Sequence, residues 1–249
     1  MKALILAGGK GKRLGSDITN IPKVMRLACG KPLLQYVLEY TDFIPPEDKV
    51  ILVGYSREAI MKAFPQYSYA VQEEQKGTGH AVMCARRYFE DYDGEILVIN
   101  GDMPLLRRES VLALAEHHRK SGSACTILSF IVTGEIPPFG HIIRDENGNV
   151  AGIVEHRDAT DAQKAVRELN GGIYIFDSRA LFGCLDRITP SPVSGEYYLT
   201  DVPKLMIAEG KKVTAVTAAD EKELAGVNTE QDLREVERII KEKTAPAAG

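Results

Sequence analysis

The sequence lacks any apolar run that approaches the roughly 20 residues of a membrane-spanning helix, so we do not expect a membrane protein. It also lacks a basic excess, because 31 Lys and Arg stand against 35 Asp and Glu, for a net charge of −4. No general surface for nucleic acid or anionic membrane is therefore expected, and attraction for phosphate must be local. The N-terminus shows no basic segment and no small-residue cleavage site, which favours a cytoplasmic protein.

Cysteine is scarce, and the arrangements that support several kinds of catalysis are missing. The cysteines at positions 29, 84, 125 and 184 are far apart and form no C-x-x-C pair, which favours free thiols in a reducing compartment. No two histidines have zinc-ligand spacing, and no Ser–His–Asp arrangement is evident. Zinc chemistry and an activated serine are therefore not predicted.

What the sequence does have is a glycine-rich, basic loop directly after its first apolar run. Lys2–Ala7 is typical of a buried strand, and Gly8–Arg13 follows it with the sequence Gly-Gly-Lys-Gly-Lys-Arg. Glycines leave backbone N–H groups uncovered, and such groups can cradle phosphate oxygens. The basic side chains and Lys23 add the positive charge that a polyphosphate requires. The loop therefore predicts a triphosphate site, with a simple turn as the alternative.

Two well-known phosphate loops are excluded by spacing. A P-loop needs Ser or Thr after its Gly-Lys pair, whereas Arg13 follows Gly11-Lys12 and Pro32 follows Gly30-Lys31. A dinucleotide loop of the form G-x-G-x-x-G would need a glycine where Leu14 stands. An NAD-dependent dehydrogenase is therefore disfavoured.

The order of apolar and amphipathic segments predicts the fold class. Strands and helices alternate up to about residue 122, which predicts a Rossmann-like, doubly wound, mostly parallel α/β sheet. Beyond Ala124 the pattern changes, and the turn sequence Asp145–Asn149 between two apolar runs predicts an antiparallel hairpin. Further strands are expected over Cys125–Val132 and Asn170–Phe176, and a closing helix over Thr229–Lys243. We therefore expect an antiparallel-rich second lobe beside the parallel sheet, with a cleft between them.

Three polar clusters follow expected strands, where open α/β sheets bind their ligands. They are Gly8–Arg13, Gln72–Thr78 and Gly101-Asp102. Asp102 offers the hard oxygen that Mg²⁺ prefers, and the glutamine amides suit the edge of a nucleobase. Taken singly, each residue has a simpler explanation: Asp102 as a turn residue and Thr78 as a helix cap. The convergence of the three clusters on one edge is what supports the functional interpretation.

Motifs in order along nearly the whole chain carry a family resemblance. Those of the first half resemble the sugar-1-phosphate nucleotidylyltransferases: Leu6–Leu14, Pro22-Lys23, Gly30–Leu33, Glu74–Ala81 and Gly101–Leu105. Those of the second half resemble the pyrophosphorylase (uridylyltransferase) domain of the bifunctional UDP-N-acetylglucosamine enzyme: Phe139–Asp145, Ile153–Asp158, Glu168–Tyr174, Gly195–Asp201 and Gly226–Asn228. The hexapeptide repeats of that enzyme's acetyltransferase domain are not in the sequence, so we expect no such domain here.

The resemblance implies a nucleotide-diphospho-sugar transferase fold and a division of the chain. A single domain is expected over residues 1–243, with a nucleotide-binding half (1–122), a sugar-binding half (123–228), a closing helix (229–243) and a flexible tail (244–249). The implied reaction is transfer of a uridylyl group from UTP to a sugar 1-phosphate with Mg²⁺ as cofactor. N-acetylglucosamine 1-phosphate is the favoured acceptor. Glucose 1-phosphate, dTTP as donor, and a non-catalytic nucleotide-sugar binding protein remain alternatives.

The resemblance also implies roles for matching residues. Arg13, Lys23 and Asp102 would be catalytic, with Arg13 on the departing pyrophosphate. Asp102 and Asn228 would hold Mg²⁺. The residues expected to border the nucleotide are Leu6, Ala7, Gly8, Gly9, Gly11, Gln72, Gln75, Gly77 and Thr78, and those expected at the sugar are Gly140, Glu155 and Asn170. No general base is required, because the attacking sugar-phosphate oxygen is already ionised near neutral pH.

Overall fold

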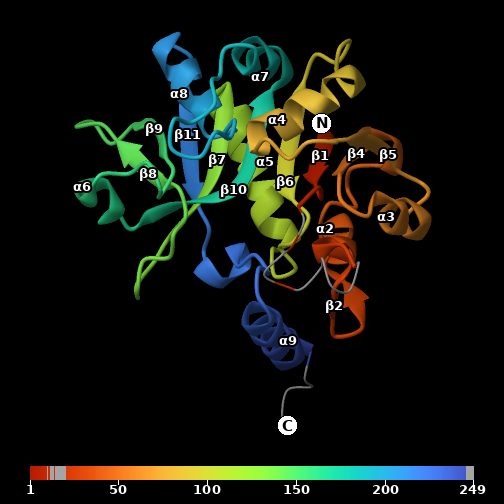
Figure 1. Ribbon diagram of the computed structural model, residues 1–249. Helices are drawn as coiled ribbons and strands as arrows, with labels where there is room; N and C mark the ends of the chain where they lie inside the picture. Colours follow the sequence, from red (N-terminus) through yellow and green to blue (C-terminus); the bar gives the residue numbers. More distant parts are fainter. Residues whose placement is uncertain (10, 12–13, 15–20, 245–249) are drawn as a thin grey trace.

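The computed structural model describes residues 1–9, 11, 14 and 21–244, and a central sheet organises them (Figure 1). Nine strands of the described chain form this sheet, seven of them in the order β11-β7-β10-β6-β1-β4-β5. Their bounds are β1 Lys2–Leu6, β4 Lys49–Val53, β5 Ser68–Val71, β6 Glu95–Asn100, β7 Cys125–Ile131, β10 Glu168–Asp177 and β11 Val213–Thr217. Neighbours in this order are parallel except where β10 pairs antiparallel with β6 and β7.

The central strands are apolar on both faces because helices cover both faces. On one side, α2 (Leu33–Tyr40), α3 (Arg57–Ala63) and α5 (Arg108–Ser121) pack against alternate residues of β1, β4 and β6. On the other side, α4 (Thr78–Ala85), α7 (Ser178–Leu185) and α8 (Asp201–Ala208) pack against the intervening residues. Strands buried in this way read as continuous apolar runs, which is why the sequence predicts them well. The predicted Rossmann-like, mostly parallel sheet is confirmed.

The antiparallel second half is also confirmed. β8 (His141–Arg144) and β9 (Val150–Val154) form the predicted hairpin, and β8 joins the main sheet through β10. The Asp145 carboxylate accepts the N–H groups of Asn147 and Asn149, which fixes the turn. A short helix that the sequence did not predict, α6 (Asp161–Lys164), follows the hairpin.

A third apolar cluster joins the closing helix to the segment after the glycine-rich loop. α9 (Glu230–Thr244) contributes Leu233, Val236 and Ile239, which pack against Tyr36 and Leu33 of α2. The short strands β2 (Leu27–Ala28) and β3 (Lys31–Pro32) lie beside it, preceded by the one-turn helix η2 (Lys23–Met25). The other one-turn helices are η3 (Pro46–Asp48), η4 (Arg86–Tyr88) and η5 (Glu221–Leu224). The predicted closing helix is confirmed and includes Thr244, whereas 245–249 of the expected tail lie outside the described residues.

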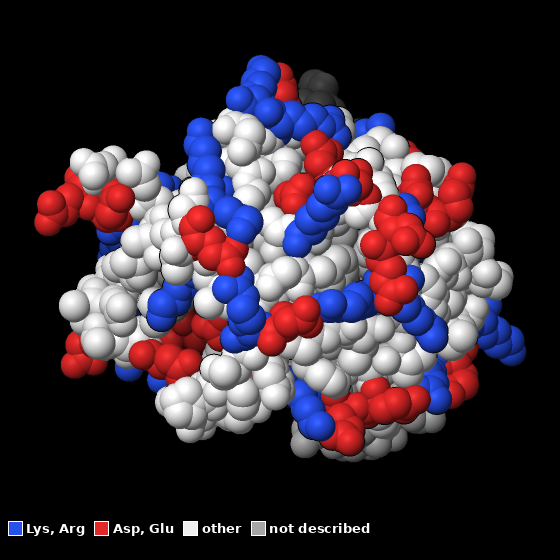
Figure 2. All heavy atoms as spheres, turned by 90° about the horizontal axis from the view of Figure 1, so that it is seen from above, with Lys and Arg blue, Asp and Glu red and all other residues white. Residues whose placement is uncertain are grey.

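The surface is mixed in charge on the face seen from above, where Lys and Arg are interspersed with Asp and Glu (Figure 2). Within the described residues, none of the helices has both the length and the apolar character to cross a membrane. The cysteines at positions 29, 84, 125 and 184 are all free thiols, as predicted.

Candidate active site

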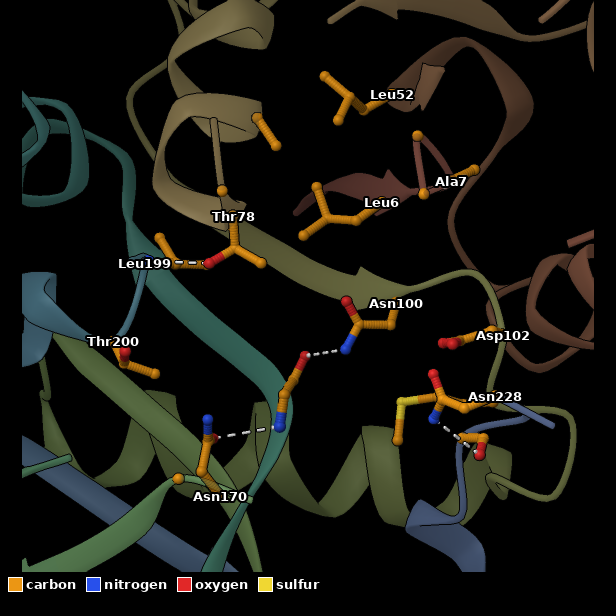
Figure 3. A pocket seen from close by; sticks show the side chains of 18 of the residues that line it. Leu6, Ala7, Leu52, Thr78, Asn100, Asp102, Asn170, Leu199, Thr200 and Asn228 are labelled. Carbon is orange, nitrogen blue, oxygen red and sulfur yellow. Dashed lines mark hydrogen bonds between the residues drawn. The ribbon is translucent and has the colours of Figure 1, made fainter. Parts of the chain in front are cut away.

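A cavity of about 490 Å³ lies where the loops after several sheet strands meet. Of the predicted site residues in the described chain, all except Gly11 line it: Leu6, Ala7, Gly8, Gly9, Lys23, Gln72, Gln75, Gly77, Thr78, Asp102, Gly140, Glu155, Asn170 and Asn228. Figure 3 shows Asp102 and Asn228 toward one end, Asn170 and Thr200 toward the other, and Asn100 between them. The loops therefore converge as the strand-edge rule predicts.

Two predicted residues are not placed in the cavity. Gly11 has a φ of +60°, its carbonyl accepts the Leu14 N–H at 2.9 Å, and it does not line the cavity. Arg13 lies outside the described residues. Their predicted contacts with the nucleotide and the pyrophosphate stay predictions.

The end of the cavity after β6 gathers a cation and two oxygen donors. The Lys23 ammonium forms an ion pair with the Asp102 carboxylate and donates to Asn228 Oδ1 at 2.7 Å. The side chains of Lys23 and Asp102 are only 14% and 16% exposed, so water screens the pair weakly. The Val227 N–H donates to the Asp102 carbonyl at 3.0 Å, which holds the segment carrying Asn228 against the β6 loop. Sequence positions 23, 102 and 228 thus meet at one point.

This donor set fits a magnesium ion. A carboxylate oxygen and an amide oxygen already face one positive charge, and both are hard ligands. The described residues contain no group of three or more His, Cys, Asp or Glu that would build a full protein cage. A pair of protein oxygens suits Mg²⁺, which usually takes its remaining ligands from phosphates and water.

The predicted base-binding glutamines tie the nucleotide loops together. Gln75 Nε2 donates to the Gly8 carbonyl, which joins the loop after β5 to the loop after β1. Gln72 is buried, and its Nε2 donates to the Gly77 carbonyl at 3.1 Å. Gly54 directly follows β4, and a Cβ there would lie 2.9 Å from the Gly8 carbonyl oxygen. The close approach of the chain after β4 to the loop after β1 therefore requires a glycine at position 54.

A segment of the second half pairs with the loop at residues 72–78, which is predicted to hold the nucleobase and is called the nucleotide loop below. Tyr197 donates its N–H to the Lys76 carbonyl and accepts the Gly79 N–H, each at 2.8 Å. Next to them, the Thr78 hydroxyl accepts the Leu199 N–H at 3.0 Å (Figure 3). Gly77 has a φ of +100°, and a Cβ there would lie 2.5 Å from the Tyr197 carbonyl oxygen. Only glycine allows this approach.

The opposite end of the cavity holds a half-buried carboxyl group, that of Glu155. Glu155 Oε1 accepts the Thr200 hydroxyl at 2.8 Å. Burial raises the pKa of Glu155; the Thr200 bond opposes this, and the nearby carboxylates of Asp158 and Asp201 raise it further. Beside it, the Asn170 backbone N–H donates to the Gly140 carbonyl at 2.8 Å. The three predicted sugar residues therefore lie together.

Asn100, Tyr174 and Thr200 are among the cavity residues that sequence reasoning missed. Asn100 is the last residue of β6, so the strand-edge rule that selected Asp102 contains the signal for it. Its Nδ2 donates to the Gly172 carbonyl at 3.4 Å, so it joins β6 to the bend in β10 (Figure 3). Thr200 lies in the motif Gly195–Asp201, which carried the resemblance, and it follows residues 197–199, which hydrogen-bond to residues 76–79.

Comparison with known proteins now decides the family. The sequence model of the family described as "Nucleotidyl transferase" matches residues 2–241. The chain belongs to the nucleotidyl transferase family. This nucleotidyl transferase is 42% identical over 241 residues to the bifunctional protein GlmU of Clostridium novyi and 38% identical over 242 residues to that of Geobacillus thermodenitrificans. These matches cover 96% and 97% of the chain, and the chain spans about half, 52%, of each relative's length.

A solved structure agrees on the fold. The crystal structure of a UDP-glucose pyrophosphorylase complexed with UDP-glucose superimposes on this nucleotidyl transferase with a TM-score of 0.76. The match covers 97% of this chain and 98% of the other, at 18% identity. At that identity the similarity establishes the shared fold, and it confirms the predicted nucleotide-diphospho-sugar transferase fold.

Proposed function

We propose that the chain transfers a uridylyl group from UTP to N-acetylglucosamine 1-phosphate, giving UDP-N-acetylglucosamine and pyrophosphate. The observation that carries this proposal is the two-ended cavity. One end gathers Lys23, Asp102 and Asn228, which suit phosphates and a cation, and the other gathers Glu155 and Asn170, which suit a sugar. Two substrates that bring their phosphate groups to one end of the cavity and a sugar to the other match this distribution of charge.

The protein's task in this reaction is alignment and charge neutralisation. A phosphate oxygen of the sugar 1-phosphate attacks the α-phosphorus of UTP; a new P–O bond forms, and the bond to the β-phosphate oxygen breaks. Pyrophosphate leaves with the electron pair of that bond, and no proton transfer is needed at the nucleophile. Lys23, whose ammonium lies beside Asp102, would neutralise the two anions, which would otherwise repel each other.

Asp102 and Asn228 would hold the magnesium ion. When bound, such an ion neutralises phosphate charge and helps to orient the triphosphate. In the structure the Lys23 ammonium lies between the same two oxygens. Lys23 must therefore turn from these oxygens toward the phosphates when the cation binds.

The experiment that tests the proposal is pyrophosphate release with a matrix of substrates. UTP, dTTP, CTP and GTP are each combined with glucose 1-phosphate and N-acetylglucosamine 1-phosphate, with and without Mg²⁺. The Asp102→Ala variant serves as the control for the active site. Turnover confined to UTP, N-acetylglucosamine 1-phosphate and Mg²⁺ is expected.

Other outcomes select other functions. Preferred turnover with glucose 1-phosphate or dTTP keeps the reaction class and replaces the substrate. Nucleotide binding without turnover for any substrate pair would contradict the proposal that the chain is an enzyme, and it would favour a nucleotide-sugar binding protein.

A further inference from the structure

A bulge in β10 brings a tyrosine to the sugar end of the cavity. Asn170 pairs with Ser129 of β7, and the next paired residue, Ile173, faces Leu128, so Gly171 and Gly172 have no partners in the ladder. Tyr174 is therefore two ladder steps from Asn170 rather than four, and the two side chains share one face. At about 3.3 Å per residue, the bulge shortens a separation of about 13 Å to about 7 Å.

Both glycines of the bulge are required by close contacts. A Cβ at Gly171 would lie 2.6 Å from the Leu128 carbonyl oxygen. Gly172 has a φ of +71°, and a Cβ there would lie 2.6 Å from Asn100 Nδ2. The bulge is thus fixed by its surroundings, and Tyr174 is held in place beside Asn170.

The hydrogen bonds around Asn170 decide which way the tyrosine proton points. The Gly172 N–H can only donate, so the Asn170 atom 3.1 Å from it is the amide oxygen (Figure 3). The amide nitrogen therefore faces Tyr174 and donates to its hydroxyl oxygen at 2.6 Å. Because that oxygen accepts, its own proton must point elsewhere. Among the described residues, the Tyr174 hydroxyl donates no hydrogen bond of its own.

Two unused donors therefore meet at this end of the cavity: the Tyr174 O–H and the second N–H of Asn170. Tyr174 is only 3% exposed, and burial raises its pKa far above the usual range, so the hydroxyl keeps its proton. A Cβ at Gly140 would lie 3.7 Å from the Asn170 nitrogen, so the glycine leaves space over the amide. Buried donors without partners are costly, which favours a ligand that accepts from both.

We infer that Tyr174 determines sugar specificity by donating, together with the Asn170 amide, to the acyl oxygen of the sugar's acetamido group. This inference rests on the proposed function. A carbonyl oxygen has two lone pairs and can accept both hydrogen bonds, whereas the carboxylate of Glu155 is suited to sugar hydroxyl groups. A sugar with a hydroxyl in place of the acetamido group lacks this carbonyl and leaves the donors less well satisfied.

The test is the binding of UDP, UDP-glucose and UDP-N-acetylglucosamine, measured by calorimetry on native protein and on Tyr174→Phe. Phenylalanine keeps the ring and removes the donor. The matched control is Tyr36→Phe, which removes a buried tyrosine hydroxyl that donates to the Ala28 carbonyl at 2.9 Å in the cluster beside α9. Thermal unfolding of each variant checks the fold.

For Tyr174→Phe we expect an affinity loss of about tenfold for UDP-N-acetylglucosamine, as for one lost hydrogen bond. The affinities for UDP and UDP-glucose are expected to stay within about twofold, and Tyr36→Phe is expected to bind all three ligands like native protein. The KM for the acetamido sugar 1-phosphate should rise in Tyr174→Phe without a matching rise in the KM for UTP.

Several results would overturn the inference. An unchanged affinity for UDP-N-acetylglucosamine in Tyr174→Phe would remove the proposed contact, and equal losses for all three ligands would show that the residue acts through the fold. Either result leaves the proposed function standing if native protein still binds UDP-N-acetylglucosamine more tightly than UDP. Native protein that binds no uridine nucleotide would contradict the proposed function and this inference together.

Discussion

Replacing Lys23 is expected to separate metal binding from turnover. In the structure the Lys23 ammonium lies between Asp102 and Asn228, the oxygens proposed to bind Mg²⁺. A divalent cation entering the free protein must therefore displace the ammonium. The Lys23→Gln variant removes this competitor, so we expect it to bind a divalent cation more tightly than native protein while it loses activity.

The size of the effect follows from the ion pair. Two unit charges about 3 Å apart interact with about 5 kcal/mol at an effective dielectric constant of about 20. Desolvation of the two groups offsets most of this, and we expect about 1–2 kcal/mol net. Removing the ammonium should therefore tighten cation binding by about 5- to 30-fold. Turnover should fall by about 10²- to 10³-fold, as for the loss of one charge-stabilising donor at a reacting centre.

The assay is titration of the free protein with Mn²⁺ followed by electron paramagnetic resonance, beside pyrophosphate release in the turnover assay. Lys31→Gln is the control, because Lys31 also pairs with a carboxylate, that of Glu39, but does so away from the cavity. Weaker or unchanged Mn²⁺ binding in Lys23→Gln would refute the competition between ammonium and metal. Native turnover in this variant would remove Lys23 from the reacting phosphates.

Three further perturbations test other parts of the structure. Because the pKa of Glu155 is raised, lowering the pH should protonate it earlier than an ordinary glutamate and raise the KM for the sugar 1-phosphate. Glu155→Gln should abolish this pH dependence of the KM. The same variant should raise Tm at pH 7, because the partly buried charge of ionised Glu155 destabilises the fold. Burial lowers the pKa of Lys49 from 10.5 to about 8, so the unfolded chain binds the extra proton between these values and stability should rise with pH there. Urea unfolding should find Lys49→Met more stable than native protein at pH 7, with the difference shrinking toward pH 10.5; an equal difference at both pH values would contradict this. Gly77→Ala should lower Tm and raise the KM for UTP because of its φ and its contact with Tyr197, whereas Gly183→Ala, in open space on α7, should raise stability by about 1 kcal/mol.

The sequence predicts those features that depend on local pattern. The strands β1, β4 and β6 are continuous apolar runs, and the Asp145–Asn149 turn carries its own hydrogen-bonding side chain. The site residues could be grouped because parallel strands deliver their carboxyl ends to one edge of the sheet. Local chemistry and this one geometric rule account for the clusters Gly8–Arg13, Gln72–Thr78 and Gly101-Asp102, whereas Gly140, Glu155, Asn170 and Asn228 were predicted only through the family resemblance.

Features that depend on pairing between distant segments could not be predicted. The apolar run of β10 does not indicate that this strand lies between β6 and β7. The two-residue bulge becomes visible only in the register of β10 with β7. Nothing in the sequence therefore shows that Tyr174 lies two ladder steps from Asn170 rather than four. The four-residue helix α6 and the two-residue strands β2 and β3 are too short to show a period.

The pairing of residues 197–199 with the nucleotide loop bears on how this protein could be redesigned. Thr200, the next residue, donates to Glu155, so the loop expected to read the base and the carboxyl group expected to read the sugar are attached to the same short stretch of chain. If residues 72–78 were replaced by those of a protein with another base preference, the new loop would have a backbone suited to a different partner segment than residues 197–199. Such a graft should therefore disturb sugar binding as well as base preference. We expect it to change the base preference alone only when residues 195–200 are exchanged together with residues 72–78.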